Sequence, residues 1–160
     1  MIIYTDGACK GNPGPGGWGV ILLGPDKVAE YGGREEASTN NRMELMAAIE
    51  ALTQVQLDAS LPKTFCLCSD SKYVLQGIQD WISGWKRNGW RNAAGKPVAN
   101  QDLWQRLDLL RTSVSITWKY VPAHTGIPGN ERADAIASAF ALGEEPTLYA
   151  GSREAYAIGV

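Results

Sequence analysis

Three strand-like runs follow one another at the start of the chain with no helix between them, and this order restricts the folds that the chain can adopt. The runs are "MIIYTDGAC", "GWGVILL" and a third around residues 28–33, and the segment "KGNPGPGG" joins the first two. Strand-forming runs that are separated by Gly, Pro and Asn predict antiparallel neighbours. The chain therefore opens with three antiparallel strands.

Helical and strand-like segments alternate in the rest of the chain. Apolar residues at helical spacing predict helices over residues 40–54, 71–82, 101–110 and 130–142. Short apolar runs predict strands over residues 64–69 and 114–121. Strands that are connected through helices pair in parallel. We therefore expect an α/β fold in which helices cover the faces of a mixed sheet.

The length of 160 residues favours a single domain. The composition, 44% hydrophobic and 20% charged, is that of a globular protein. The N-terminus lacks a signal-peptide pattern, and no apolar stretch approaches the roughly 18 residues of a membrane span. The three cysteines, Cys9, Cys66 and Cys68, lack metal-site spacing and are read as reduced thiols. We expect a cytoplasmic protein with no membrane partner.

Four acidic residues are candidates for a functional site. One lies where an acid is unusual, and the other three also have a possible structural role. Asp6 lies inside the first predicted strand, where Asp is depleted. Asp70 ends a buried strand and could cap the next helix, and Glu44 follows Asn41 at the spacing of a capping box. Asp134 could simply favour the positive end of the last helix. Asp70, Glu44 and Asp134 taken alone therefore each have a structural explanation, and Asp6 has none of this kind.

Taken together, the four acids predict a metal site. Small residues follow Glu44 and Asp134 at helical spacing, so both helices can approach the sheet closely. The acids would then meet Asp6 and Asp70 at the strand ends and would repel one another unless cations were present. Carboxylate oxygens suit Mg²⁺ or Mn²⁺. Two such ions about 4 Å apart can activate a water and stabilise the leaving oxygen of a phosphodiester.

The segment from residue 81 to residue 101 is basic and aromatic, although the net charge of the chain is −2. It contains no Asp or Glu. Its cations could neutralise phosphates while its rings pack against sugars or bases, and a solvated loop over peripheral core aromatics is the alternative. The residues concerned are Trp81, Trp85, Lys86, Arg87, Trp90, Arg91 and Lys96, with Trp104 shortly after them.

The only histidine, His124, lies in the loop "AHTGIPGNE", ten residues before Asp134. A structural histidine is the alternative explanation, but the loop offers little apolar sequence that could bury the ring. Histidine titrates near neutrality, so a surface imidazole can exchange protons under working conditions. We therefore expect His124 to assist the chemistry at the acidic site.

The motifs "YTDGACKGNPGPGGWG", "STNNRMELMAA", "CSDSKYV", "DLWQRL" and "NERADAIA" occur in an order that resembles type 1 ribonuclease H, which cuts the RNA strand of RNA–DNA hybrids. The resemblance implies a five-stranded mixed sheet flanked by helices. It also implies two Mg²⁺ ions, with Mn²⁺ as a possible substitute, and products with 5′-phosphate and 3′-hydroxyl ends. The catalytic residues it implies are Asp6, Glu44, Asp70, His124 and Asp134.

The resemblance covers residues 1–142, which we expect to form the catalytic domain. Residues 143–160 lose clear periodicity, and we expect a mobile or loosely docked tail. The chain departs from the family at Glu36 and Ala37, where many bacterial members carry an arginine nearby. It also carries Lys72 where an amide is common. We expect a monomer.

The resemblance further implies which residues bind the hybrid. The 2′-hydroxyl alone distinguishes RNA from DNA locally. The residues expected beside the RNA sugars are Cys9, Asn12, Asn40 and Glu44. Thr39 and Asn100 are expected near a DNA phosphate, and Trp81 and Trp85 in the groove that holds the DNA strand. The basic residues named above complete the expected hybrid-binding surface.

Two other functions remain open at this point. The chain could be a hybrid-binding module that has the fold without turnover, although a pure binder gains nothing from mutually repelling acids. It could also be the core of a DNA transposase or integrase, although such proteins usually carry further DNA-binding domains, for which 160 residues leave no room.

Overall fold

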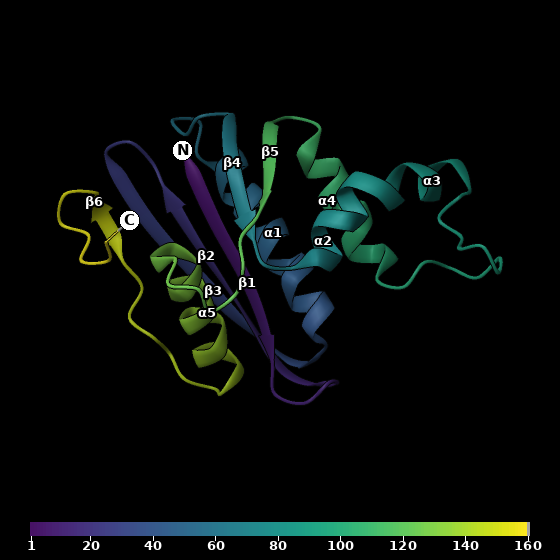
Figure 1. Ribbon diagram of the computed structural model, residues 1–160, viewed down its shortest axis with the longest axis horizontal. Coiled ribbons are helices and arrows are strands. Elements are labelled where there is room, and N and C mark those ends of the chain that lie inside the picture. Colours follow the sequence, from purple (N-terminus) through teal and green to yellow (C-terminus); the bar gives the residue numbers. More distant parts are fainter. Residues whose placement is uncertain (160) are drawn as a thin grey trace.

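The computed structural model describes residues 1–159, in which one mixed sheet separates two layers of helices (Figure 1). The sheet has the strand order β5-β4-β1-β2-β3-β6. Strands β1, β2 and β3 are antiparallel, β4 and β5 run parallel to β1, and β6 is antiparallel to β3. The strands are β1 (Ile2–Cys9), β2 (Gly14–Leu23), β3 (Lys27–Ser38), β4 (Thr64–Ser69), β5 (Ser115–Tyr120) and β6 (Ala150–Ser152).

The helices divide between the two faces of the sheet. One core packs α1 and α4 against one face, and a second core packs α5 against the other, in agreement with Figure 1. The alternation along β2 explains the division, because Val20 and Leu22 face the first core while Ile21 and Leu23 face the second. The helices are α1 (Asn40–Leu57), α2 (Lys72–Gln76), the π-helix η1 (Gly77–Trp81), α3 (Ile82–Arg87), α4 (Gln101–Arg111) and α5 (Pro128–Ala141). Among residues 1–159, no helix has both the length and the apolar character to cross a membrane.

The expected α/β fold with a mixed sheet is confirmed, but the expected number of five strands is wrong. The sixth strand, β6, comes from the tail and pairs with the start of β3. Leu148, Tyr149 and Tyr156 pack against the second core, and Arg153 donates to the carbonyl oxygen of Gly24 at 3.0 Å. The tail is therefore docked on the sheet edge in this structure. Its three-residue strand is too short to show a period of two in the sequence.

The absence of a side chain at Gly77 lets η1 pack closely against the buried Trp104. A Cβ atom at Gly77 would overlap the indole ring of Trp104, which is fully buried. We therefore expect Gly77→Ala to lower the free energy of unfolding by about 2 kcal/mol, because the overlap forces the ring or the helix to move. Urea unfolding measures this change.

The matched control for this prediction is Gly84→Ala in α3. A Cβ atom there would meet no atom closer than 3.9 Å, at Nη2 of Arg87. Alanine is favoured over glycine inside a helix, so this variant should be as stable as the parent or up to about 1 kcal/mol more stable. Equal effects of the two substitutions would rule out the steric explanation.

Candidate active site

The site lies on the central strands of the sheet, where β1 and β4 run side by side. Thr5 of β1 is in register with Ser69 of β4, so the next residues, Asp6 within β1 and Asp70 just beyond the end of β4, are neighbours. Glu44 reaches them from α1. One carboxylate oxygen from each of Asp6, Glu44 and Asp70 lies within 4.8 Å of the others. The sequence prediction that these three acids converge therefore agrees with the structure.

The structure excludes the capping explanations for two of these acids. Ser71, and not Asp70, caps α2, because its Oγ accepts a hydrogen bond from the Val74 amide at 3.2 Å. Thr39 caps α1, so Glu44 does not occupy the position that closes a capping box. Both carboxylates are thus free of a role at a helix end.

A glycine on β1 allows Glu44 to come so close. A Cβ atom at Gly7 would overlap the backbone of Met43 and Glu44. Since position 7 has no side chain, α1 lies directly against β1 beside Asp6. The helix begins just before this contact, where Thr39 Oγ1 caps it by accepting from the Arg42 amide at 3.2 Å.

Asp134 approaches the same centre from the opposite face of the sheet. It lies in the second turn of α5, beyond the first turn, where an acid interacts most with the helix dipole. Its charge is close enough to Asp6 to raise the pKa of that group. Its Oδ1 accepts from Ser138 Oγ at 3.3 Å. Asp134 thus borders the cluster of three acids rather than joining it within 4.8 Å.

The electrostatics of the cluster are unfavourable for four charged acids. Burial, and after it the charge of Asp70, raises the pKa of Asp6 to about 8. Burial, followed by the charges of Asp6 and Asp70, raises the pKa of Glu44 well above its ordinary value. The Oε2 atom of Glu44 is buried without a hydrogen-bond partner. A divalent cation would neutralise these charges and give this oxygen a partner, so the residues fit Mg²⁺ or Mn²⁺.

The raised pKa of Asp6 predicts how stability depends on pH in a buffer that contains a chelator. The folded protein keeps a proton that the unfolded chain releases near about pH 4, so the free energy of unfolding should fall as pH rises from about 4 to about 8. Each pH unit can cost at most about 1.4 kcal/mol for this proton. Asp6→Asn removes the titration, and urea unfolding should show it to be more stable than the parent at pH 8. An equal fall in both proteins would assign the pH dependence to other groups.

His124 lies at the edge of the site on an exposed loop. Its Nδ1 is 3.9 Å from Oδ2 of Asp134, and its side chain is 80% exposed. Its φ angle of 54° is in the left-handed region, which is unusual for a residue with a side chain. Glu131 Oε1 accepts from the Gly126 amide at 3.0 Å and so ties the loop to α5. The imidazole is thus largely exposed, as expected from the sequence, and the alternative of a buried structural histidine does not apply.

The sequence interpretation missed Asn130. Its Nδ2 donates to Oδ2 of Asp70 at 3.2 Å, it is only 2% exposed, and its Oδ1 is buried without a partner. The signal was available in the sequence, because residues 130 and 134 are one helical turn apart and share a face. Asn130 thus orients the Asp70 carboxylate from α5.

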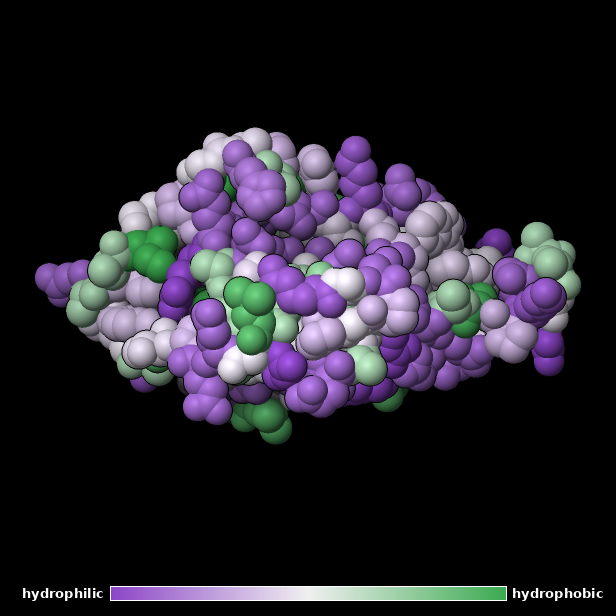
Figure 2. Space-filling model, turned by 90° about the horizontal axis from the view of Figure 1, so that it is seen from below, coloured by the Kyte–Doolittle hydropathy of each residue, from purple (hydrophilic) through white to green (hydrophobic). Residues whose placement is uncertain are grey.

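The residues expected beside the RNA sugars gather between the β1–β2 turn and the start of α1. Asn12 Oδ1 accepts from the Asn40 amide at 3.2 Å. Cys9 Sγ donates to the carbonyl oxygens of Gly14 at 3.3 Å and Ser38 at 3.4 Å. The β1–β2 turn and the start of α1 therefore form one continuous polar surface next to Glu44. We call this surface, formed by Cys9, Asn12 and Asn40, the polar ledge. Seen from the lower end of the molecule, polar residues cover most of the surface and apolar residues are scattered (Figure 2).

Asn100 is joined to α1 through a polar network. Its Oδ1 accepts from Arg42 Nη1 at 3.3 Å, and its Nδ2 donates to the Tyr73 hydroxyl at 3.0 Å. Asp102 holds Arg42 with two hydrogen bonds, at 2.8 and 3.0 Å. The network connects the start of α4 with the first turn of α1, which Thr39 caps.

The aromatic residues form a continuous row. The ring centroids are 5.8 Å apart for Trp81 and Trp85 and 6.3 Å apart for Trp85 and Trp90. Trp104 packs beneath Trp85 at 5.4 Å and is fully buried, so it belongs to the core. Trp81, Trp85 and Trp90 stay half-exposed and can meet a ligand.

The basic residues of this segment are not equivalent. Lys86 forms an ion pair with Asp108 at 2.9 Å, and Arg91 donates to the Gly95 carbonyl oxygen at 2.9 Å. Arg87 and Lys96 are exposed. The structure thus ties Lys86 to α4, and Arg87 and Lys96 remain the more accessible cations.

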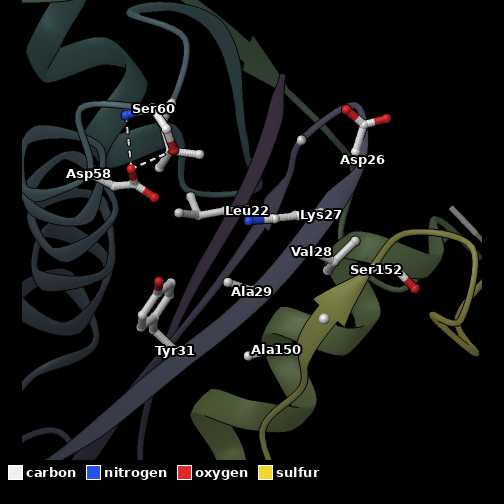
Figure 3. Close-up of a pocket in the computed structure, with 13 residues that line it drawn as sticks. Leu22, Asp26, Lys27, Val28, Ala29, Tyr31, Asp58, Ser60, Ala150 and Ser152 are labelled. Carbon is white, nitrogen blue, oxygen red and sulfur yellow. Dashed lines mark hydrogen bonds between the residues drawn. The ribbon is translucent and has the colours of Figure 1, made fainter.

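A pocket of about 490 Å³ lies away from these acids, between the start of β3, residues 58–61 and β6 (Figure 3). Its apolar wall includes Leu22, Val28 and Tyr31. The polar groups on it are partly occupied, because Asp58 Oδ1 accepts from the hydroxyl and the amide of Ser60 at 2.6 and 2.9 Å. No carboxylate of the acidic cluster lines this pocket, which is therefore separate from the site.

The mixed sheet and the cluster of acids on it define an α/β enzyme whose site is suited to a divalent metal ion. The chain belongs to the RNase H family, whose model matches residues 1–141. Ribonuclease H of a Cyanothece species is 58% identical over 147 residues, which are 91% of this chain and 92% of the relative. Ribonuclease HI of Caulobacter vibrioides is 56% identical over 138 residues, 86% of this chain and 90% of the relative.

A solved structure agrees with this membership. LC9-RNase H1, described as a type 1 RNase H with the type 2 active-site motif, has a TM-score of 0.80 and 29% identity, over 92% of this chain and 75% of that one. The resemblance to ribonuclease H that the motifs indicated is thus confirmed. The chain is an endoribonuclease of the RNase H type.

Proposed function

We propose that the enzyme hydrolyses the RNA strand of RNA–DNA hybrids and leaves 5′-phosphate and 3′-hydroxyl ends. The observation that carries the proposal is the meeting of Asp6, Glu44 and Asp70 within 4.8 Å, with Asp134 beside them. Mg²⁺ is the proposed cofactor, with Mn²⁺ as a substitute, and two such ions supply water activation and stabilisation of the leaving oxygen when bound. The four acids would hold them.

The other residues of the site would act on protons and on orientation. Asn130 holds the Asp70 carboxylate through its hydrogen bond, and so fixes the direction of one ligand. His124 can accept the proton of the attacking water or donate one to the leaving oxygen, since its exposed loop allows it to turn toward a bound phosphate. Glu131 limits how far that loop can move.

The hybrid would lie across the polar ledge and the aromatic row. Cys9, Asn12 and Asn40 are proposed to contact the RNA sugars, where the 2′-hydroxyl identifies RNA. Thr39 and Asn100 are proposed to hold a DNA phosphate. The row formed by Trp81, Trp85 and Trp90 is proposed to pack against the DNA strand, with phosphates neutralised by Lys86, Arg87, Arg91 and Lys96.

Arg87→Ala should raise the KM for the hybrid and weaken its dependence on salt. One lost phosphate contact should reduce the slope of log K against log salt by about 0.9 if hybrids behave like B-form duplex. The matched control is Arg106→Ala, which also removes an exposed charge, but from α4 outside the basic segment. Fluorescence anisotropy with a labelled hybrid at several salt concentrations gives both slopes, and equal slopes would make Arg87 an ordinary surface charge.

One experiment tests the proposed function. Labelled RNA–DNA, RNA–RNA and DNA–DNA duplexes are incubated with the enzyme in Mg²⁺, in Mn²⁺ or in chelator, and the ends of the products are mapped. We expect cleavage of RNA in the hybrid alone and only with a cation. Binding without cleavage would indicate a hybrid-binding module, and cleavage of DNA would indicate a transposase-like core. A monomeric state, a cytoplasmic location and a catalytic domain at residues 1–142 stay predictions.

A further inference from the structure

A buried ion pair joins β3, α5 and the tail on the α5 side of the sheet. Glu30 of β3 has a side chain that is only 1% exposed, and its carboxylate accepts two hydrogen bonds from Arg132, both at 2.8 Å. The same carboxylate accepts from the Tyr149 amide at 2.9 Å and from the Tyr156 hydroxyl at 2.7 Å. We call Glu30, Arg132, Tyr149 and Tyr156 the Glu30 clamp.

The tail supplies half of the clamp. Tyr149 and Tyr156 both lie beyond residue 142, and their rings pack against each other at a tilt of 48°, with centroids 5.0 Å apart. Arg132 also donates to the Thr147 carbonyl oxygen at 2.9 Å. Burial raises the pKa of Glu30, yet the hydrogen bonds from Arg132 and Tyr156 outweigh it and leave the pKa below its usual value. The clamp is therefore an ionised and fully satisfied network.

Arg132 lies on α5 between the two residues that this helix contributes to the site. Asn130 holds Asp70, and Asp134 borders Asp6. Elsewhere α5 is fixed by close backbone contact, since a Cβ atom at Gly17 or Gly19 would overlap its backbone. Such contact sets the distance between the helix and β2. The rotation of α5 about its axis and its position along that axis then depend on the side chains around it.

The bidentate ion pair between Arg132 and Glu30 restricts the rotation and the axial movement of α5. Two parallel hydrogen bonds between a guanidinium and a carboxylate fix direction as well as distance. Glu30 is itself held by the sheet, because its position in β3 is in register with Ile21 of β2. The clamp therefore ties the orientation of the first two turns of α5 to the sheet that carries Asp6.

We propose that the Glu30 clamp, completed by the C-terminal tail, positions Asn130 and Asp134 and thereby sets the cation affinity of the acidic site. Glu30, Arg132 and Tyr156 are positioning residues, and they touch neither cation nor substrate. The proposal rests on the proposed role of Asp134 as a cation ligand. It gives the tail a function that is separate from its contribution to stability.

The test compares Glu30→Gln and Tyr156→Phe with Arg153→Ala in the full chain. Arg153→Ala removes a tail anchor at Gly24, on the β2–β3 turn, and leaves the clamp intact. Mn²⁺ binding is measured by isothermal titration calorimetry without substrate, beside the thermal midpoint and the Mg²⁺ dependence of hybrid cleavage. Outer partners of metal ligands commonly contribute about 10-fold to 100-fold in affinity, so this more remote clamp should contribute about 3-fold to 10-fold in Glu30→Gln.

We expect weaker Mn²⁺ binding in Glu30→Gln, a smaller loss in Tyr156→Phe and none in Arg153→Ala, although all three lower the thermal midpoint. The KM for the hybrid should stay within about twofold of the parent, since no residue of the clamp belongs to the proposed hybrid-binding surface. Mn²⁺ affinities that follow the thermal midpoint in all three variants, or that do not change in Tyr156→Phe and Glu30→Gln, would overturn the proposal. Calorimetry reports on the clamp even if the parent proves not to cleave hybrids, so the two proposals fail separately.

Discussion

Asp70→Asn is expected to lower kcat for hybrid cleavage by about 10³-fold or more, because a neutral amide cannot replace a carboxylate that holds a divalent cation. The fold should survive the change, since Asp70 neither caps α2 nor lies in a helix. Removing its charge also relieves the repulsion that raises the pKa of Asp6 and Glu44. In chelator the thermal midpoint should therefore equal or exceed that of the parent.

Single-turnover cleavage of a labelled hybrid in Mg²⁺, together with thermal unfolding in chelator, measures both effects. Asp80→Asn is the matched control, because it makes the same chemical change at an exposed carboxylate of η1. This control should keep the parent rate. Near-normal hydrolysis by Asp70→Asn would remove Asp70 from the mechanism.

His124→Ala is expected to lower kcat by roughly one to three orders of magnitude, a range that overlaps the contribution of about 10²-fold to 10⁴-fold that general acid–base assistance usually makes. The KM and the thermal midpoint should change little, because the side chain is 80% exposed and its nearest charged partner, Asp134, is 3.9 Å away. Steady-state kinetics at saturating Mg²⁺ gives kcat and KM separately. Added imidazole should restore part of the lost rate if proton transfer is the role of the ring.

The opposite effects of His124→Ala on kcat and on stability would contradict the proton-transfer role. A clear loss of stability with an unchanged kcat would make the ring a structural element of the loop. Thr125→Ala is a suitable control for loop damage, because the Thr125 hydroxyl donates to the Pro122 carbonyl oxygen at 2.9 Å within the same loop. This variant should disturb the loop without removing an imidazole.

The convergence of the acids could be predicted from the sequence because it follows from chain direction. Strands that are joined through a helix run parallel, so the residues that follow Thr5 and Ser69 lie side by side. Glu44 and Asp134 could be assigned from the small residues near them on their helices. The depth of Glu44 could not be predicted in this way, because it depends on the missing side chain at Gly7, which lies opposite α1 only in the folded state.

Features that depend on long-range polar contacts were not predictable from local patterns. The tail docks through Tyr149 and Tyr156 on Glu30, which is more than 100 positions away in the chain. The ion pair that Lys86 of the basic segment forms with Asp108 of α4 was likewise not foreseen, and its proposed contact with a phosphate stays a prediction. Such pairings have no periodicity, and only the fold brings their members together.

The bare backbone contact at Gly7 also bears on attempts to change the cation that the enzyme prefers. Where side chains separate a helix from a strand, larger or smaller residues can widen or narrow a metal site in small steps. Here the backbone of α1 already rests on β1, so no packing substitution beneath Glu44 can adjust the spacing of the acids. Engineering a preference for a larger ion would have to shorten or replace a ligand, for example by Glu44→Asp. No layer of side chains lies between α1 and β1 at Gly7 that could be resized instead.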